Sequence, residues 1–139
     1  MRDNKLLEGK LEQIWSEYFN DVPKSNRITI GFGRKAKKRL GSIREKKGES
    51  SKKFDTLILI NSHFKNRKIP EYIIDATIAH ELCHYAHGFA SPLPQLSRYP
   101  HRGGAVDREL ITRGLGHLVK KETDWLNANW FNYLDNLSA

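Results

Sequence analysis

IPEYIIDATIAHELCHYAHG, residues 69–88, contains the pattern H-E-x-x-H, formed by His80, Glu81 and His84. If this stretch is helical, His80 and His84 project from one face a turn apart, so both imidazoles can bind one metal ion. Glu81 then points at the water molecule that the metal holds. The pattern therefore predicts a zinc site that hydrolyses amide bonds, provided that its surroundings form a helix.

The residues around this pattern predict an amphipathic helix. Pro70 stands at the first turn, where its missing amide proton costs nothing, and acidic residues follow it near the positive end of the helix dipole. Ile74, Ile78 and Leu82 recur every four positions and would bury one stripe. Gly88 supplies a stop at the carboxyl end. The pattern thus lies on the kind of element that its chemistry requires.

A catalytic zinc ion needs a third protein ligand and an open fourth position for water. His101 is the first candidate, because it follows a proline-rich loop that can turn the chain back toward the first helix. Glu109 is the carboxylate alternative. His87 would crowd three ligands onto one short helix, and His63 and His117 are expected to be structural or exposed.

Several short pieces of the chain occur in a defined order over roughly residues 27–118. They are Leu40-Gly41-Ser42, Leu57-Ile58-Leu59-Ile60-Asn61, Pro70, Ile73-Ile74-Asp75, His80-Glu81-Leu82-Cys83-His84 and the later His101. With this ordered set the chain resembles the SprT-like zinc metalloproteases, which include the bacterial SprT type and the catalytic domain of Spartan, the eukaryotic protease of DNA–protein crosslinks. The resemblance implies zinc on His80, His84 and His101, with Glu81 as the catalytic acid and base.

The chain also resembles the minimal soluble gluzincins, single small domains whose third zinc ligand is a glutamate, and this would favour Glu109 over His101. Either resemblance implies Zn²⁺ as the cofactor and hydrolysis of a peptide bond in a protein or peptide substrate.

The metal would lower the pKa of a bound water toward about 7, and Glu81 would accept its proton. The developing oxyanion needs a further donor. Four residues have side chains able to donate to the oxyanion, namely Tyr85, His87, Tyr99 and Arg102. The sequence does not decide among them.

The composition predicts one small enzyme domain over residues 1–139. A chain of 139 residues with 38% hydrophobic content can bury a single core. No apolar run reaches the roughly 18 residues that cross a bilayer, and the first residues do not form an apolar signal segment. We therefore expect a soluble, cytoplasmic protein with no membrane partner. The lone Cys83 fits a reducing compartment and is expected to be a small buried residue, not a ligand.

Periodicity along the chain, together with the resemblance, predicts a small α+β domain of the zincin-like kind. Apolar residues at helical spacing predict a helix over the first twenty residues, ending near residues 20–23. The sheet should be short, antiparallel and three-stranded, and after the H-E-x-x-H helix an irregular loop should lead to two C-terminal helices. The predicted strands are 27–33, 39–43 and 56–60, the loop is roughly 88–100, and the last helices are about 103–120 and 124–137. One edge strand should lie beside the cleft and hold the substrate extended; the sequence does not show which.

The last predicted helix carries an apolar stripe. Its members are Trp125, Leu126, Trp130, Phe131 and Leu134. Core packing is the simpler interpretation. The alternative is a C-terminal segment that covers the cleft and keeps the enzyme latent.

The formal net charge is +8, and the excess lies between residues 34 and 68. The basic residues of this range are Arg34, Lys35, Lys37, Lys38, Arg39, Arg44, Lys46, Lys47, Lys52, Lys53, Lys65, Arg67 and Lys68. Such a concentration can neutralise phosphates, although a solvated basic face that keeps a small protein soluble would show the same pattern. The resemblance favours DNA, and thus a peptidase that acts on DNA-associated proteins.

Two other classes of protein compete with the enzyme. A basic nucleic-acid-binding module with a non-catalytic or latent metal site would account for the charge, but it leaves the H-E-x-x-H helix without a purpose. A structural zinc protein needs a closed four-ligand site, usually with several cysteines, and this chain has one. The sequence therefore favours a zinc metallopeptidase.

Overall fold

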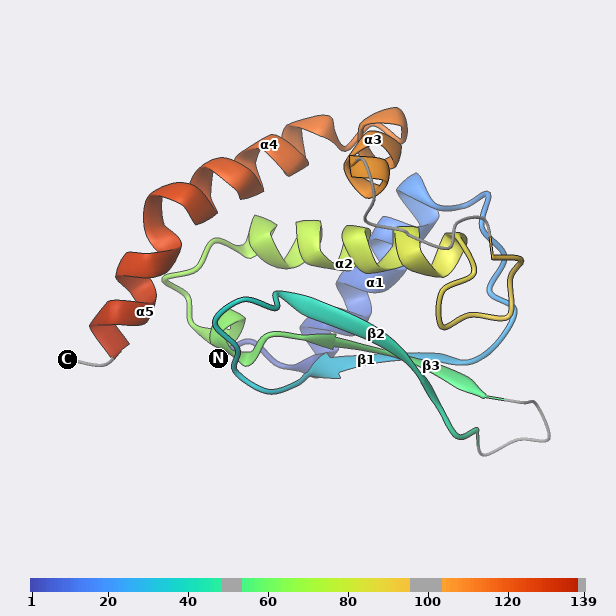
Figure 1. Cartoon of the computed structure of the whole chain (residues 1–139). Helices are drawn as coiled ribbons and strands as arrows, with labels where there is room; N and C mark the ends of the chain where they lie inside the picture. The colour runs from blue at the N-terminus through green and yellow to red at the C-terminus, as the bar shows by residue number, and fades with distance from the viewer. Residues whose placement is uncertain (49–53, 96–103, 138–139) are drawn as a thin grey trace.

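The computed structural model describes residues 1–48, 54–95 and 104–137, which form an α+β fold, as predicted (Figure 1). The elements are α1 (Asn4–Tyr18), β1 (Ile28–Phe32), β2 (Gly41–Lys46), β3 (Asp55–Ile60), a 3-10 turn (Ser62–Lys65), α2 (Glu71–Ala86), α3 (Ala105–Thr112), α4 (Gly116–Trp125), a π-helical turn (Leu126–Trp130) and α5 (Phe131–Leu137). The sheet lies beneath α1 and α2, and α4 crosses above α2 (Figure 1).

The sheet is mixed, so the prediction of an antiparallel sheet is wrong for β1. The strand order is β1-β3-β2, with β3 in the centre. β3 is antiparallel to β2, with Gly41 opposite Ile60, and parallel to β1, with Ile28 opposite Thr56. Because β1 and β2 run in opposite directions on either side of β3, the central strand can be antiparallel to only one of them. Side-chain alternation predicts which face is buried, but it carries no information on strand direction.

α1 forms where the sequence predicts it, although it ends earlier than expected. The carboxylate of Asp3 accepts a hydrogen bond of 3.0 Å from the amide of Leu6 and caps the helix. The helix ends at Tyr18, where the amide of Phe19 still bonds to the carbonyl of Trp15. The helix packs against β1 and α2. Its buried apolar positions are Leu7, Leu11, Ile14 and Trp15.

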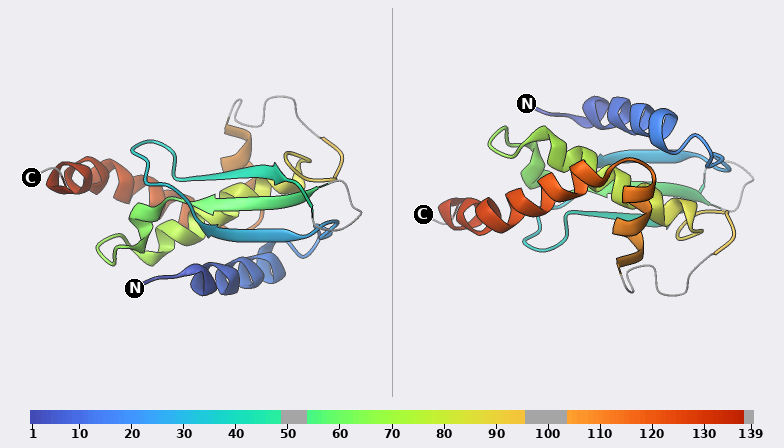
Figure 2. Two further views of the ribbon diagram at one scale, coloured as in Figure 1. Left: turned by 90° about the horizontal axis from the view of Figure 1, so that it is seen from below. Right: turned by 90° about the horizontal axis from the view of Figure 1, so that it is seen from above.

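α2 lies between the sheet on one side and α3 and α4 on the other (Figures 1 and 2). The predicted stripe of Ile74, Ile78 and Leu82 is buried, but Ala76, Ala79 and Cys83 on the opposite side are buried as well. A helix that is covered on both sides carries apolar residues nearly all round. The prediction of one buried stripe therefore accounts for only one of the two buried sides of α2. Within the described ranges, no helix is both long and apolar enough to cross a membrane.

The C-terminal helices divide at different points from those predicted. The expected helix at 103–120 is interrupted between α3 and α4, where Gly114 has φ 90°, a conformation that favours glycine. The expected break near residue 122 is absent, because α4 continues through the π-helical turn into α5. The apolar stripe mostly packs on the core, as the simpler interpretation expects: Trp130 is 6% exposed, whereas Phe131 is 73% exposed.

Candidate functional site

His80 and His84 converge on one point. Their Nε2 atoms lie 3.2 Å apart, and the two ring planes are inclined by 74°. Two nitrogen ligands of a tetrahedral zinc ion, each about 2.0–2.1 Å from the metal, are about 3.3 Å apart. The pair therefore has the separation of two ligands of one zinc ion.

The end of α2 fixes the second histidine. His84 is 4% exposed, and its ring lies 5.6 Å from that of Phe89, measured between centroids. Gly88 has φ 82°, and the chain turns there. The amide of Phe89 consequently donates a hydrogen bond of 2.9 Å to the carbonyl of His84. A Cβ at this glycine would lie 2.4 Å from the carbonyl oxygen of Pro94, so both the conformation and the close approach require glycine. The predicted stop at Gly88 thus also shapes the site.

Glu81 is buried beside the first residue of β2. Its side chain is 5% exposed, and burial raises its pKa to about 7, with the positive charge of Arg39 opposing part of that rise. A Cβ placed on Gly41 would lie 3.4 Å from Oε2 of Glu81. β2 therefore passes directly alongside the carboxylate.

β2 is the outer strand of the sheet that lies beside this carboxylate. The amide of Asn61 donates 2.9 Å to the carbonyl of Leu40, so this carbonyl points toward the β3 side. Bonded residues alternate along an antiparallel pair, and the amide and carbonyl groups of Gly41 and Ile43 consequently point away from β3. The other outer strand, β1, is approached by α1, where Asn4 accepts from the amide of Phe32 at 3.0 Å.

The connection between β1 and β2 is braced from two sides. The side-chain nitrogen of Asn61, a residue 3% exposed, donates to the carbonyls of Ala36 and Arg39 at 2.7 and 2.9 Å. The indole of Trp130 donates 2.7 Å to the carbonyl of Lys37. These bonds hold the segment that brings Arg39 and Gly41 to Glu81.

The third ligand is not decided by the described residues. His101 lies outside them. The carboxylate of Glu109 forms a hydrogen bond with His87 and accepts another, of 3.2 Å, from Nε of Arg113. Burial tends to raise the pKa of Glu109, but these two partners hold that pKa below its usual value. Among the described residues no third histidine, cysteine, aspartate or glutamate joins His80 and His84 in a metal-binding group. The structure thus places Glu109 with partners other than the two motif histidines.

The remaining titratable candidates lie in packing positions or at the surface. His63 is 7% exposed and lies edge-on to the rings of Trp130 and Tyr133, while His117 is exposed. Cys83 is buried, and burial together with the nearby Glu109 raises the pKa of its thiol. The burial of Cys83 and the exposure of His117 are as expected from the sequence.

Of the candidate oxyanion donors, two fall within the described residues and both are engaged elsewhere. The hydroxyl of Tyr85 donates 2.7 Å to the side chain of Asn26, and His87 is paired with Glu109. Tyr99 and Arg102 lie outside the described residues.

Two charged residues are not singled out by the sequence: Arg39, whose positive charge acts on Glu81, and Glu122 on α4. Arg39 was counted only as one of many basic residues. Glu122 of α4 is half-buried, and burial together with Asp107 raises its pKa to about 7. A signal existed for Glu122, because it continues the helical spacing of the buried Leu115 and Leu118.

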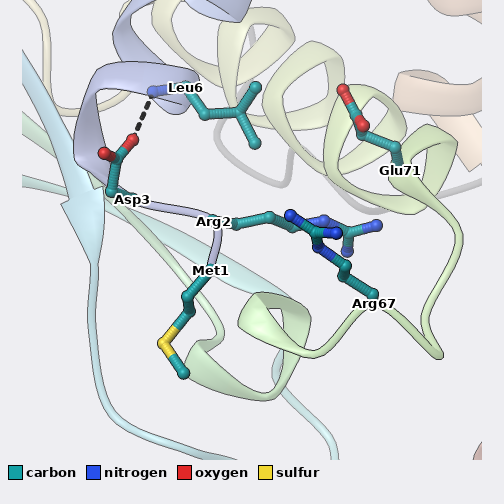
Figure 3. Close-up of a pocket in the computed structure, with 6 residues that line it drawn as sticks. All are labelled: Met1, Arg2, Asp3, Leu6, Arg67 and Glu71. Atoms are coloured by element: carbon teal, nitrogen blue, oxygen red, sulfur yellow. Dashed lines mark hydrogen bonds between the residues drawn. The ribbon is translucent and has the colours of Figure 1, made fainter.

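A cavity of about 460 Å³ lies at the other end of α2 (Figure 3). Its lining is Met1, Arg2, Asp3, Leu6, Arg67 and Glu71. Arg2 donates to the carbonyls of Phe64 and Asn66 at 2.8 and 3.2 Å, and Asp3 caps α1, so these groups serve the fold. The cavity contains none of the motif residues.

The candidate site therefore comprises two convergent histidines, a buried glutamate and an adjacent strand edge. Comparisons of the chain with protein-family models, with curated proteins and with solved structures give no match.

Proposed function

We propose that this chain is a zinc-dependent metallopeptidase. The observation that carries the proposal is the 3.2 Å separation of the Nε2 atoms of His80 and His84. The buried carboxylate of Glu81 one residue along, beside the edge strand β2, supports it. The resemblance to SprT-like proteases supplies His101 as the third ligand.

Each residue has a distinct role in this proposal. Zinc held at this site would polarise a water molecule and the substrate carbonyl, so that attack occurs near neutral pH. Glu81 accepts the proton of the attacking water and passes it to the departing amine. The packing of α2 between the sheet and α4 keeps both histidines oriented before substrate arrives.

β2 would hold the substrate. An extended peptide can pair with the outward amide and carbonyl groups of Gly41 and Ile43, next to Glu81. Main-chain bonding of this kind depends little on the substrate's sequence. It would place a peptide bond next to Glu81.

The first test is zinc stoichiometry by elemental analysis, combined with casein hydrolysis. We expect one zinc ion per chain in the wild type, loss of zinc in His80→Ala and His101→Ala, and retention in His117→Ala, the control at an exposed histidine. Glu81→Gln should keep zinc and lose hydrolysis. A wild-type protein that binds no zinc would refute the proposal.

A second candidate function is nucleic-acid binding, which would direct the peptidase to DNA-associated proteins or operate without catalysis. The favouring observation is that the chain segments at 33–38 and 62–68 are joined, since Ser62 bonds to the carbonyls of Gly33 and Arg34. This basic cluster consists of Arg34, Lys35, Lys37, Lys38, Lys65, Arg67 and Lys68. If the cluster binds nucleic acid, duplex DNA should bind and the affinity should fall steeply as salt is added. Replacing the basic residues of the cluster by neutral ones should abolish this binding.

A further inference from the structure

We propose that Arg44 selects acidic side chains in the part of the substrate that lies along β2. The proposal rests on the peptidase function above and specifies its substrate class: protein segments with an aspartate or glutamate at a defined distance from the cleaved bond. It follows from the register of β2, the face on which Arg44 lies and the residues opposite it.

Arg44 lies on the face of the sheet that the helices leave open. Side chains alternate along a strand, and Ile43, which is 7% exposed, packs on the helical side. Arg44 and Lys46 therefore lie on the other face, and both are exposed. When the three-stranded sheet is viewed from below, no described helix lies in front of its strands (Figure 2).

Arg44 has no carboxylate opposite it on the sheet. Its partner in β3 is Leu57, whereas Lys46 stands opposite Asp55, which offsets part of the lysine charge. Glu45 belongs to the same face as Ile43. The charge of Arg44 is therefore not offset by its partner in β3, unlike the charge of Lys46.

A peptide paired with the edge of β2 that faces away from β3 would place one of its side chains directly beside Arg44. Cβ atoms of directly opposed residues are about 5 Å apart, a distance at which opposite charges attract and like charges repel. Gly41 adjoins Glu81, and Arg44 lies three positions further along the strand. At about 3.3 Å per residue this is about 10 Å, so the selected acid lies about three residues from the cleaved bond.

A peptide fits this edge better than a nucleic acid does. The edge offers carbonyl acceptors alternating with amide donors, and an extended peptide satisfies both kinds of group. A phosphate backbone accepts hydrogen bonds but cannot donate them to the carbonyls of Gly41 and Ile43. The basic cluster defined above, which precedes β2 in the chain and extends to residues 62–68, remains the better surface for phosphates.

The test is a set of quenched fluorescent peptides in which each position within four residues of the cleaved bond is Glu, Gln or Lys in turn. The wild-type zinc protein should show kcat/KM about two- to fivefold higher for Glu than for Gln at one position about three residues from the bond, and this ratio should shrink with added salt. Arg44→Gln should remove the preference, and Arg44→Glu should reverse it toward Lys. Lys5→Glu, an exposed charge reversal on α1, is the matched control and should leave it unchanged.

Binding of the same peptides to Glu81→Gln, measured by fluorescence anisotropy, separates the two proposals. Selective binding without any cleavage by the wild type would refute the peptidase function and leave the role of Arg44 standing. Cleavage with no acidic preference, or with a preference that Arg44→Glu does not alter, would overturn the role of Arg44. That role would also be overturned if Arg44→Glu lost duplex DNA binding while the peptide preference persisted.

Discussion

Gly41 of the edge strand lies against Thr77 of α2 so closely that a Cβ on the glycine would be 2.6 Å from Cγ2 of the threonine. Thr77 is 2% exposed, and its hydroxyl donates 2.7 Å to the carbonyl of Ile73, so it has little freedom to retreat. The absence of a side chain at Gly41 is what allows β2 to approach Glu81. The position of β2 beside Glu81 thus depends on the absence of a methyl group at Gly41.

Replacing Gly41 by alanine should move β2 away from α2. We expect a loss of about 1–3 kcal/mol in the free energy of unfolding, from urea denaturation, and at least a tenfold loss of peptidase activity with zinc retained. Gly9→Ala is the control, because nothing lies within 4 Å of its added methyl group and α1 should gain about 0.5–1 kcal/mol. Equal stability of the two variants would contradict the close packing described here.

Replacing Asn61 by alanine should release the segment before β2. The carbonyls of Ala36 and Arg39 would lose their donor, at a cost of about 2–3 kcal/mol of stability. Hydrogen exchange of residues 36–43 should quicken, while zinc content stays at one per chain. The exposed Asn129, whose side chain bonds only locally to Trp125, offers a control expected to change stability by less than about 0.5 kcal/mol. Unchanged exchange in this segment would argue against the brace.

Replacing Trp130 should lower the stability much more than replacing its neighbour Phe131. Trp130→Ala removes a buried ring that stacks on Tyr133 and contacts His63, and should cost about 3–5 kcal/mol. Phe131→Ala, at a residue that is 73% exposed, should change stability by less than about 0.5 kcal/mol. Thermal unfolding of both variants checks this. If Phe131→Ala raised peptidase activity several-fold, a latency role for this segment would regain support.

Replacing Glu109 by glutamine should weaken the fold and spare the zinc. Glu109 bonds to His87 and Arg113, so its loss should cost about 1–3 kcal/mol, measured by urea denaturation. Because those partners hold its pKa low in the folded state, its contribution is present above the unfolded pKa and fades as the pH falls through the folded value. Loss of zinc in this variant would instead identify Glu109 as the third ligand.

Glu122 should make stability depend on pH near neutrality. Burial and Asp107 raise its folded pKa to about 7, so its stabilising contribution is complete below the unfolded value and is lost as the pH rises through 7. Glu122→Gln should therefore be more stable than the wild type at pH 8 and similar to it near pH 4. A mutant that is destabilised at pH 8 would show that the carboxylate makes a favourable interaction.

Local periodicity was enough to predict much of the scaffold. The span of α2 and the approximate places of the three strands and the first helix follow from spacing that any short window contains, because a helix or strand must bury residues at its own period. The second strand, expected at 39–43, runs from Gly41 to Lys46. The same holds for the pairing of His80 with His84, since an i,i+4 spacing on a helix leaves two rings one turn apart.

Contacts between distant segments decided the rest. Three features depend on residues far apart in the chain, which no local pattern encodes. They are the parallel direction of β1, the division of the C-terminal helices and the approach of β2, and not β1, to Glu81. Glu109 bonds to His87 and Arg113 because α3 packs against α2, which is a contact between segments far apart in the chain. The sequence by itself determined the helical spacing that brings His80 and His84 together. The tertiary structure decided which strand lies beside Glu81, because burial and close approach are properties of the packed whole.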